Sequence, residues 1–105
     1  MADTIPKSEG QAKSDADFWR VADSFVAHAN AQADNTDRGV VSAGFAYSSA
    51  RFNAFVIASQ CGNKEAFEAE KAKAVDYFVE QYKLALTENV ADYSANFDKY
   101  ISQSN

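Results

Sequence analysis

Apolar residues recur every three or four positions along most of the chain, and this spacing is typical of amphipathic helices. The pattern first appears between residues 15 and 34, which we expect to form the first helix. Ser14 or Asp15 can cap its start, because their side-chain oxygens accept hydrogen bonds from the free amides of a first turn. One stripe along this helix collects Phe18, Val21, Ala22, Phe25, Val26, Ala29 and Ala33.

The stretch from Val41 to Cys61 is apolar or small around most of a helical circumference. A helix of that kind is covered on several sides, so we predict a central second helix within a bundle. Residues 35–40, with the sequence NTDRGV, should form the turn before it. Ser42 is then the expected N-cap, and Gly62 is expected to end the helix in a left-handed turn.

Arg51 carries the single formal charge of this stretch, and it projects opposite the polar sector of the helix, beside Tyr47. A guanidinium stays ionised in proteins, and leaving it unpaired in a dry site is very costly. Arg51 must therefore reach water, pair with a carboxylate, or bind an anionic ligand or partner. The candidate carboxylates are those of Asp23, Asp76 and Glu80.

A third helix is expected from about Lys64, capped by Asn63. The apolar stripe continues towards Ile101, which leaves two alternatives. Either one very long helix runs to the C-terminus, or the chain breaks near Thr87–Asn89 and a fourth helix begins. We favour the break, because Asn89 and Asp92 resemble a capping box and ordinary helices are shorter than the unbroken one.

Three large apolar residues lie away from the stripes of their helices. Trp19 can cover the rim of the core or contact another chain. Tyr77 and Leu84 face away from the main stripe of the third helix, one heptad apart, and such a pair can seed a homodimer. We therefore name Trp19, Tyr77 and Leu84 as a candidate interface.

These patterns together predict an all-α protein. The chain of 105 residues is long enough for one domain. We expect a disordered N-terminal lead over residues 1–14, followed by a helical bundle domain over residues 15–102. The bundle should be small and up-and-down, with three to four helices and the apolar second helix at its centre.

The composition narrows the classes of function. The net charge of −5 disfavours nucleic-acid binding, which needs a basic footprint. No apolar run is long enough to suggest a membrane span, and Cys61 is the only cysteine, so we expect a cytoplasmic protein without an internal disulfide. His28 has no second ligand at metal-binding spacing, so we predict no metal and no cofactor.

Part of the sequence resembles a known family. The resemblance rests on Phe18-Trp19, on the segment ARFNAF (residues 50–55), on Tyr77-Phe78 and on Asn96-Phe97-Asp98. This pattern is similar to a family of short acidic bacterial proteins classed only as a domain of unknown function. The resemblance covers roughly residues 15–98. It implies a compact helical bacterial domain, and it implies no activity, substrate or catalytic residue.

Two hypotheses on function follow. The first is a protein-interaction module that binds itself as a homodimer or binds another protein. The second is a binder of a small anionic ligand, held by Arg51 between helices with Tyr47 nearby. We expect no enzyme, because no catalytic motif is present, although an acid–base pair that meets only in three dimensions stays open. An acidic mimic of nucleic acid would need rows of carboxylates, which lysines interrupt here.

Overall fold

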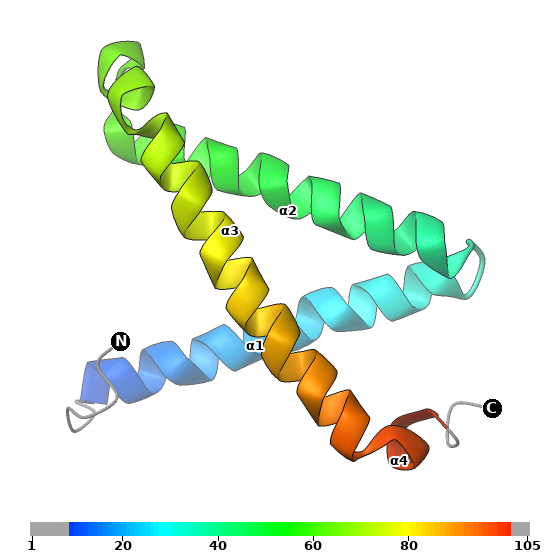
Figure 1. Cartoon of the computed structure of the whole chain (residues 1–105). Helices are drawn as coiled ribbons and strands as arrows, with labels where there is room; N and C mark the ends of the chain where they lie inside the picture. Colours follow the sequence, from blue (N-terminus) through cyan, green and yellow to red (C-terminus); the bar gives the residue numbers. More distant parts are fainter. Residues whose placement is uncertain (1–8, 102–105) are drawn as a thin grey trace. The chain divides into compact units, whose positions relative to one another are not determined.

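The computed structural model describes the backbone of residues 9–101 and the side chains of residues 14–101. This part of the chain holds three long helices and one short helix, and it contains no strand. They are α1 (Glu9–Ala33), α2 (Arg38–Cys61), α3 (Lys64–Ala95) and α4 (Phe97–Ile101), labelled in Figure 1. The predicted all-α class with three to four helices is confirmed.

The first helix begins earlier than the sequence pattern indicated. Helix α1 starts at Glu9, inside the segment that was predicted to be a disordered lead, so neither Ser14 nor Asp15 caps it. The residues before the apolar stripe include glutamate, glutamine, alanine and lysine, whose helix propensities are high, so a helix can extend through them. The part of the predicted lead in residues 1–8 lies outside the described residues.

Asp37, rather than Ser42, caps the start of α2. Its Oδ2 accepts hydrogen bonds from the backbone amides of Gly39 at 2.9 Å and of Val40 at 3.4 Å. A Cβ atom at position 39 would lie 2.9 Å from the same oxygen, so a glycine there leaves room for the capping carboxylate. The helix therefore begins at Arg38, within the predicted turn, and the prediction of an N-cap at Ser42 is wrong.

The turn between α2 and α3 follows the prediction. Gly62 adopts a φ of 83°, the left-handed conformation that glycine enters without a steric penalty. Asn63 is the N-cap of α3, and its Oδ1 accepts a hydrogen bond from the amide of Ala66 at 2.8 Å. Glu65 lies in the first turn, where a negative charge complements the helix dipole.

Helix α3 continues through Thr87–Asn89, so the predicted break at that point is wrong. Asn89 does not act as an N-cap. Its side-chain Nδ2 donates a hydrogen bond to the carbonyl of Ala85 at 2.8 Å, one turn earlier in the same helix. An asparagine inside a helix can bond backward to a carbonyl as well as forward to an amide, and the sequence alone does not distinguish the two.

The chain breaks at Asn96 instead, where a polar cluster forms around Asp92. Asn96 donates from Nδ2 to the backbone carbonyl of Asp92 at 3.1 Å and to its Oδ1 at 3.0 Å. The Tyr100 hydroxyl donates to Asp92 Oδ2 at 2.8 Å, and the Tyr93 and Tyr100 rings lie 4.4 Å apart. These contacts join the start of α4 to the last turns of α3.

The chain divides into two compact units, Met1–Phe52 and Asn53–Asn105. In the first unit the rings of Phe25 from α1 and Phe45 from α2 lie 6.4 Å apart. The second unit contains the end of α2 with α3 and α4. No described side chain in either unit is buried.

Helix α2 spans both units, and none of its residues is buried, so its predicted covering by neighbouring helices stays a prediction. An apolar circumference predicts that a helix will be covered, but it does not predict by what. Coverage is a tertiary or quaternary property, and the periodicity of one segment carries no information about the covering surface.

The capping role of Asp37 predicts a loss of stability in Asp37→Ala. Removing an N-cap carboxylate leaves the amides of Gly39 and Val40 without their side-chain acceptor, which costs about 1 kcal/mol of unfolding free energy. Urea unfolding followed by circular dichroism measures this loss. Asp34→Ala is the matched control, because Asp34 lies in the same connection and no side-chain hydrogen bond is found for it within the described residues. Equal stability of Asp37→Ala and the native chain would contradict the assignment.

The Asp92 cluster predicts a late-titrating tyrosine. The hydrogen bond to Asp92 raises the pKa of Tyr100 above its ordinary value of 10.0, with partial desolvation and the nearby negative charge adding to the shift. Because the folded-state pKa is the higher one, the stabilisation by this contact is complete below pH 10 and is lost as the pH rises through the folded-state pKa. Tyr100→Phe should remove a component that ionises above pH 10 from an absorbance titration of the tyrosines. Persistence of that component in Tyr100→Phe would refute the proposed cause.

Candidate functional site

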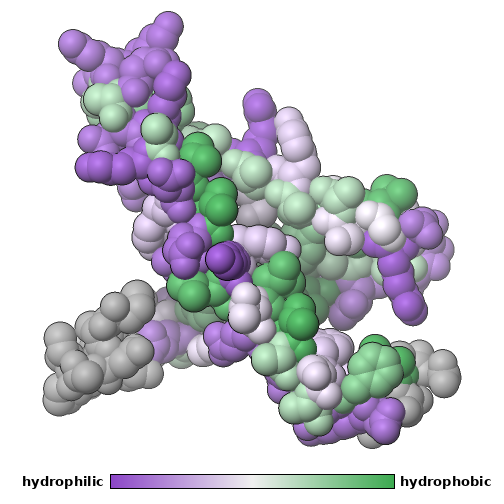
Figure 2. Space-filling view, viewed as in Figure 1, coloured by the Kyte–Doolittle hydropathy of each residue, from purple (hydrophilic) through white to green (hydrophobic). Residues whose placement is uncertain are grey.

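Large apolar side chains at the surface are the main feature that the described residues offer for function. Figure 2 shows such side chains among hydrophilic ones on the visible face. Twenty of them are between 40% and 67% exposed. They come from all four helices and comprise Phe18, Trp19, Val21, Phe25, Val26, Val40, Phe45, Tyr47, Phe52, Phe55, Val75, Tyr77, Val79, Tyr82, Leu84, Leu86, Val90, Tyr93, Phe97 and Ile101. Monomeric soluble proteins rarely expose so much apolar surface, and such surfaces are typical of interaction sites.

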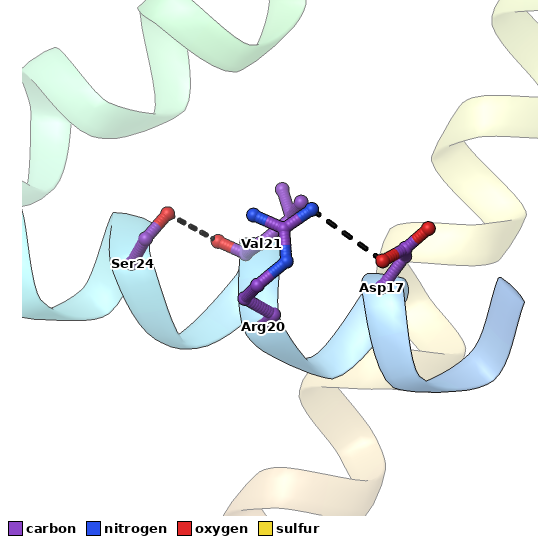
Figure 3. A network of polar contacts seen from close by, with 4 residues as sticks. All are labelled: Asp17, Arg20, Val21 and Ser24. Atoms are coloured by element: carbon purple, nitrogen blue, oxygen red, sulfur yellow. Dashed lines mark hydrogen bonds and ion pairs between the residues drawn. The ribbon is translucent and has the colours of Figure 1, made fainter. Parts of the chain in front are cut away.

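Helix α1 presents an aromatic pair on one side and a charged pair on the other. The rings of Phe18 and Trp19 meet edge to face at 4.9 Å, and these side chains are 60% and 63% exposed. Arg20 Nη2 lies 3.5 Å from Asp17 Oδ1, in the arrangement drawn in Figure 3. At roughly 100° per residue, this ion pair projects away from the aromatic pair. An exposed ion pair such as Asp17–Arg20 adds little stability, and we interpret its side of α1 as the side that faces solvent.

Ser24 follows the ion pair one turn later, and its hydroxyl donates to the carbonyl of Val21 at 2.8 Å (Figure 3). This bond satisfies the serine within its own helix. Asp17, Arg20 and Ser24 therefore find polar partners within α1 itself.

Helix α3 carries exposed apolar residues outside its main stripe as well as within it. The main stripe includes Phe78 and Tyr82, as predicted from the sequence. Tyr77 and Leu84 lie off this stripe and are 59% and 56% exposed. The Tyr77 ring meets that of its neighbour Phe78 edge to face at 5.3 Å. The predicted interface residues Trp19, Tyr77 and Leu84 are thus all exposed, and their role in an interface stays a prediction.

The second unit contains an open groove between the end of α2 and α3, with a cavity volume of about 490 Å³. Its lining includes the half-buried apolar side chains of Ile57 and Phe78 and the charged side chains of Glu70 and Lys73. The lining residues are Val56, Ile57, Gln60, Cys61, Glu70, Lys73, Ala74, Tyr77 and Phe78. We call this feature the hairpin groove. Sequence analysis did not predict it, because its two walls come from different helices.

Arg51 does not occupy the covered position that the helical projection indicated. Its side chain is exposed, and within its own unit the described residues, including Asp23, form no ion pair with it. Tyr47 is 67% exposed, and neither residue lines the hairpin groove. Within its own unit Arg51 is not enclosed by apolar side chains, and its expected position in apolar surroundings stays a prediction. Ligand binding by Arg51 and Tyr47 stays a prediction.

Cys61 and His28 are two further side chains with chemically reactive groups. Cys61 is a free, half-buried thiol at the end of α2. His28 lies 3.4 Å from the Gln32 amide nitrogen, one turn away in α1. No group of three metal-ligating side chains comes together among the described residues. None of the described helices combines the length and the apolar character that crossing a membrane requires.

The position of Arg51 predicts a small effect of its removal. Because the side chain is exposed, Arg51→Met should change the free energy of unfolding by no more than about 0.5 kcal/mol, as is usual for surface substitutions. Thermal and urea unfolding measure the change, with Arg38→Met as a second exposed arginine for comparison. A loss of several kcal/mol in Arg51→Met alone would show that a partner group holds the guanidinium.

Comparison with known proteins gives a family and no biochemical activity. No match was found among the curated proteins or among the solved structures. Residues 18–94 match the family described as "Protein of unknown function (DUF3144)", and this range includes the ARFNAF segment and most of the three long helices. The match covers well over half of the chain, in agreement with the resemblance drawn from the sequence. The chain belongs to the DUF3144 family.

Proposed function

We propose that this protein is a helical interaction module that acts by self-association, with a homodimer as the basic unit. The observation that carries the proposal is the combination of large exposed apolar side chains with the lack of any buried side chain among the described residues. Ordering a chain costs roughly 1–2 kcal/mol per residue in backbone entropy, and burial of apolar surface is the main term that offsets this cost. Within each unit that burial is small.

The amount of aromatic surface suits an interface. Eleven aromatic side chains are at least 40% exposed. With roughly 150–250 Å² for each complete side chain, they expose together on the order of 1,000 Å². A standard protein–protein interface buries about 800 Å² on each partner, and because these residues are spread over four helices and both units, one interface would use a part of them. Tyrosine, tryptophan and phenylalanine are also the residues most enriched in the centres of interfaces.

A second copy of the chain is the occupant that we favour. A two-fold dimer uses the same patch on both partners, so one exposed apolar face is enough to form it. The proposal also places the protein in the bacterial cytoplasm, which the unpaired Cys61 and the resemblance to a bacterial family support.

Self-association predicts that stability depends on protein concentration. A dimer that is more stable than its separate chains shows a Tm that rises with concentration, because association is linked to folding. We expect the Tm to increase by several degrees between about 1 and 100 µM. A change of about one or two kcal/mol in the free energy of unfolding shifts the Tm of a domain of this size by a similar amount. Circular dichroism follows the melting.

The single tryptophan gives an independent readout. Trp19 is 63% exposed in the single chain, so its fluorescence should shift to shorter wavelength as the protein concentration rises if α1 enters an interface. A Tm that is the same at every concentration, together with a cooperative transition, would contradict the proposal. The apolar faces would then be covered within one chain.

A further inference from the structure

We propose that the junction between α3 and α4 is a joint with two positions, held in its bent position by hydrogen bonds from Asn96 and Tyr100 to the carboxylate of Asp92. The other position is straight, and in it α3 continues through Asn96 to about Ile101. This inference goes beyond the proposed function and does not depend on self-association. We call Asp92, Tyr93, Asn96 and Tyr100 the latch residues.

The bend between α3 and α4 has no proline or glycine to explain it. Figure 1 shows the chain changing direction between the two helices, while residues 92–100, DYSANFDKY, contain neither residue type. Asn96 has a φ of −124° and a ψ of 32°, outside the left-handed region that favours glycine. A side chain that bonds into the helical ladder is another known cause of a bend. The latch residues provide such a side chain.

Asn96 bonds into the ladder at the point where α3 ends. Its Nδ2 donates to the carbonyl of Asp92 at 3.1 Å, and the same carbonyl accepts the backbone amide of Asn96 at 3.0 Å. Nδ2 also donates to Asp92 Oδ1 at 3.0 Å. The helical ladder is interrupted at Asn96 and resumes where the amide of Tyr100 donates to the carbonyl of Asn96 at 3.1 Å. The side chain of Asn96 therefore competes with continuation of the helix.

Tyr100 makes two contacts that only a bent chain allows. Its hydroxyl donates to Asp92 Oδ2 at 2.8 Å, and its ring centroid lies 4.4 Å from that of Tyr93. In an unbroken helix, residues 92 and 100 would be about 12 Å apart along the axis, and residues 93 and 100 about 10.5 Å. Helical side chains lean towards the N-terminus, so Asp92 would lean away from Tyr100. Straightening therefore breaks both contacts.

The sequence is compatible with the straight position as well. Val90, Tyr93, Phe97 and Ile101 recur at spacings of three and four, which is the pattern of one uninterrupted helix. Phe97 and Ile101 are 57% and 44% exposed in the bent position, so the bend does not bury them. Straightening exchanges the side-chain contacts of the latch residues for backbone hydrogen bonds across Asn96. The latch residues therefore decide between the two positions.

Loss of the Tyr100 proton opens the joint. The ionised side chain cannot donate a hydrogen bond, and its negative charge is repelled by Asp92. The groups that face it are Asp92 and Tyr93 on α3, and Lys99 on α4, whose Nζ lies 6.0 Å from the ring centroid. The hydrogen bond to Asp92 is the main cause that raises the pKa of Tyr100 above 10.0. The bent position is thus retained below pH 10 and lost as the pH rises through the folded-state pKa.

The distance between two spin labels, measured by pulsed electron paramagnetic resonance, tests the joint. In a Cys61→Ser background, Lys83→Cys and Ile101→Cys place labels on either side of Asn96, outside the latch residues. These positions are five helical turns apart, so a straight helix separates them by about 27 Å on one side, and a bend shortens this distance. Mixing with an excess of unlabelled chain restricts the measurement to one chain, whatever the oligomeric state.

The double variant Asn96→Ala/Tyr100→Phe should lengthen the label distance by several ångströms, towards about 27 Å, because alanine continues a helix and phenylalanine lacks the hydroxyl donor. Tyr82→Phe is the matched control, since it removes a tyrosine hydroxyl of α3 outside the latch residues, and it should keep the native distance. Far-UV circular dichroism confirms that each variant stays helical.

Two results would overturn the inference. One is a native distance that is already about 27 Å at neutral pH, which would mean that the joint is straight. The other is an unchanged distance in the double variant, which would mean that the latch residues do not hold the bend. The native distance should also lengthen as the pH rises through the pKa of Tyr100, and a constant distance over that range would contradict the role of its proton.

Discussion

Burial of apolar surface is the constraint on which the rest of this structure depends. Isolated helices are marginal in water, and most helical stability in proteins comes from the packing of apolar faces. The three long helices have good local signals, such as the caps at Asp37 and Asn63, yet those caps contribute only about 1 kcal/mol each. Covering the exposed aromatic side chains would therefore give the single chain its largest further gain in stability.

The local structure follows closely from the sequence where one side chain governs one turn. Gly62 and Asn63 were predicted to end one helix and start the next, and both do so. The N-cap of α2 was predicted five residues too late, at Ser42 instead of Asp37, because both are good caps and the apolar pattern favoured the later one. The break at Asn96 was missed, although Asp92, Asn96 and Tyr100 recur at four-residue spacing and can meet in three dimensions.

The candidate site was less predictable than the helices. Trp19, Tyr77 and Leu84 were identified from their positions off the stripes, and the structure leaves all three exposed. Arg51 drew attention because a helical projection placed it among apolar neighbours, but a projection shows only the sides of one helix. Whether another segment covers a side depends on contacts between distant residues. The hairpin groove went unrecognised for the same reason, since residues near 57 and near 77 form it together.

We propose that association of two copies completes the stability of helices whose ends are defined locally. Helix α3 carries exposed apolar residues within and outside its main stripe, which fits this proposal. The molar mass in solution, measured by light scattering across a range of dilutions, tests this claim most directly. The account predicts a mass of about twice the 11.5 kDa of one chain that falls towards 11.5 kDa on dilution. A mass of 11.5 kDa at every concentration would contradict it.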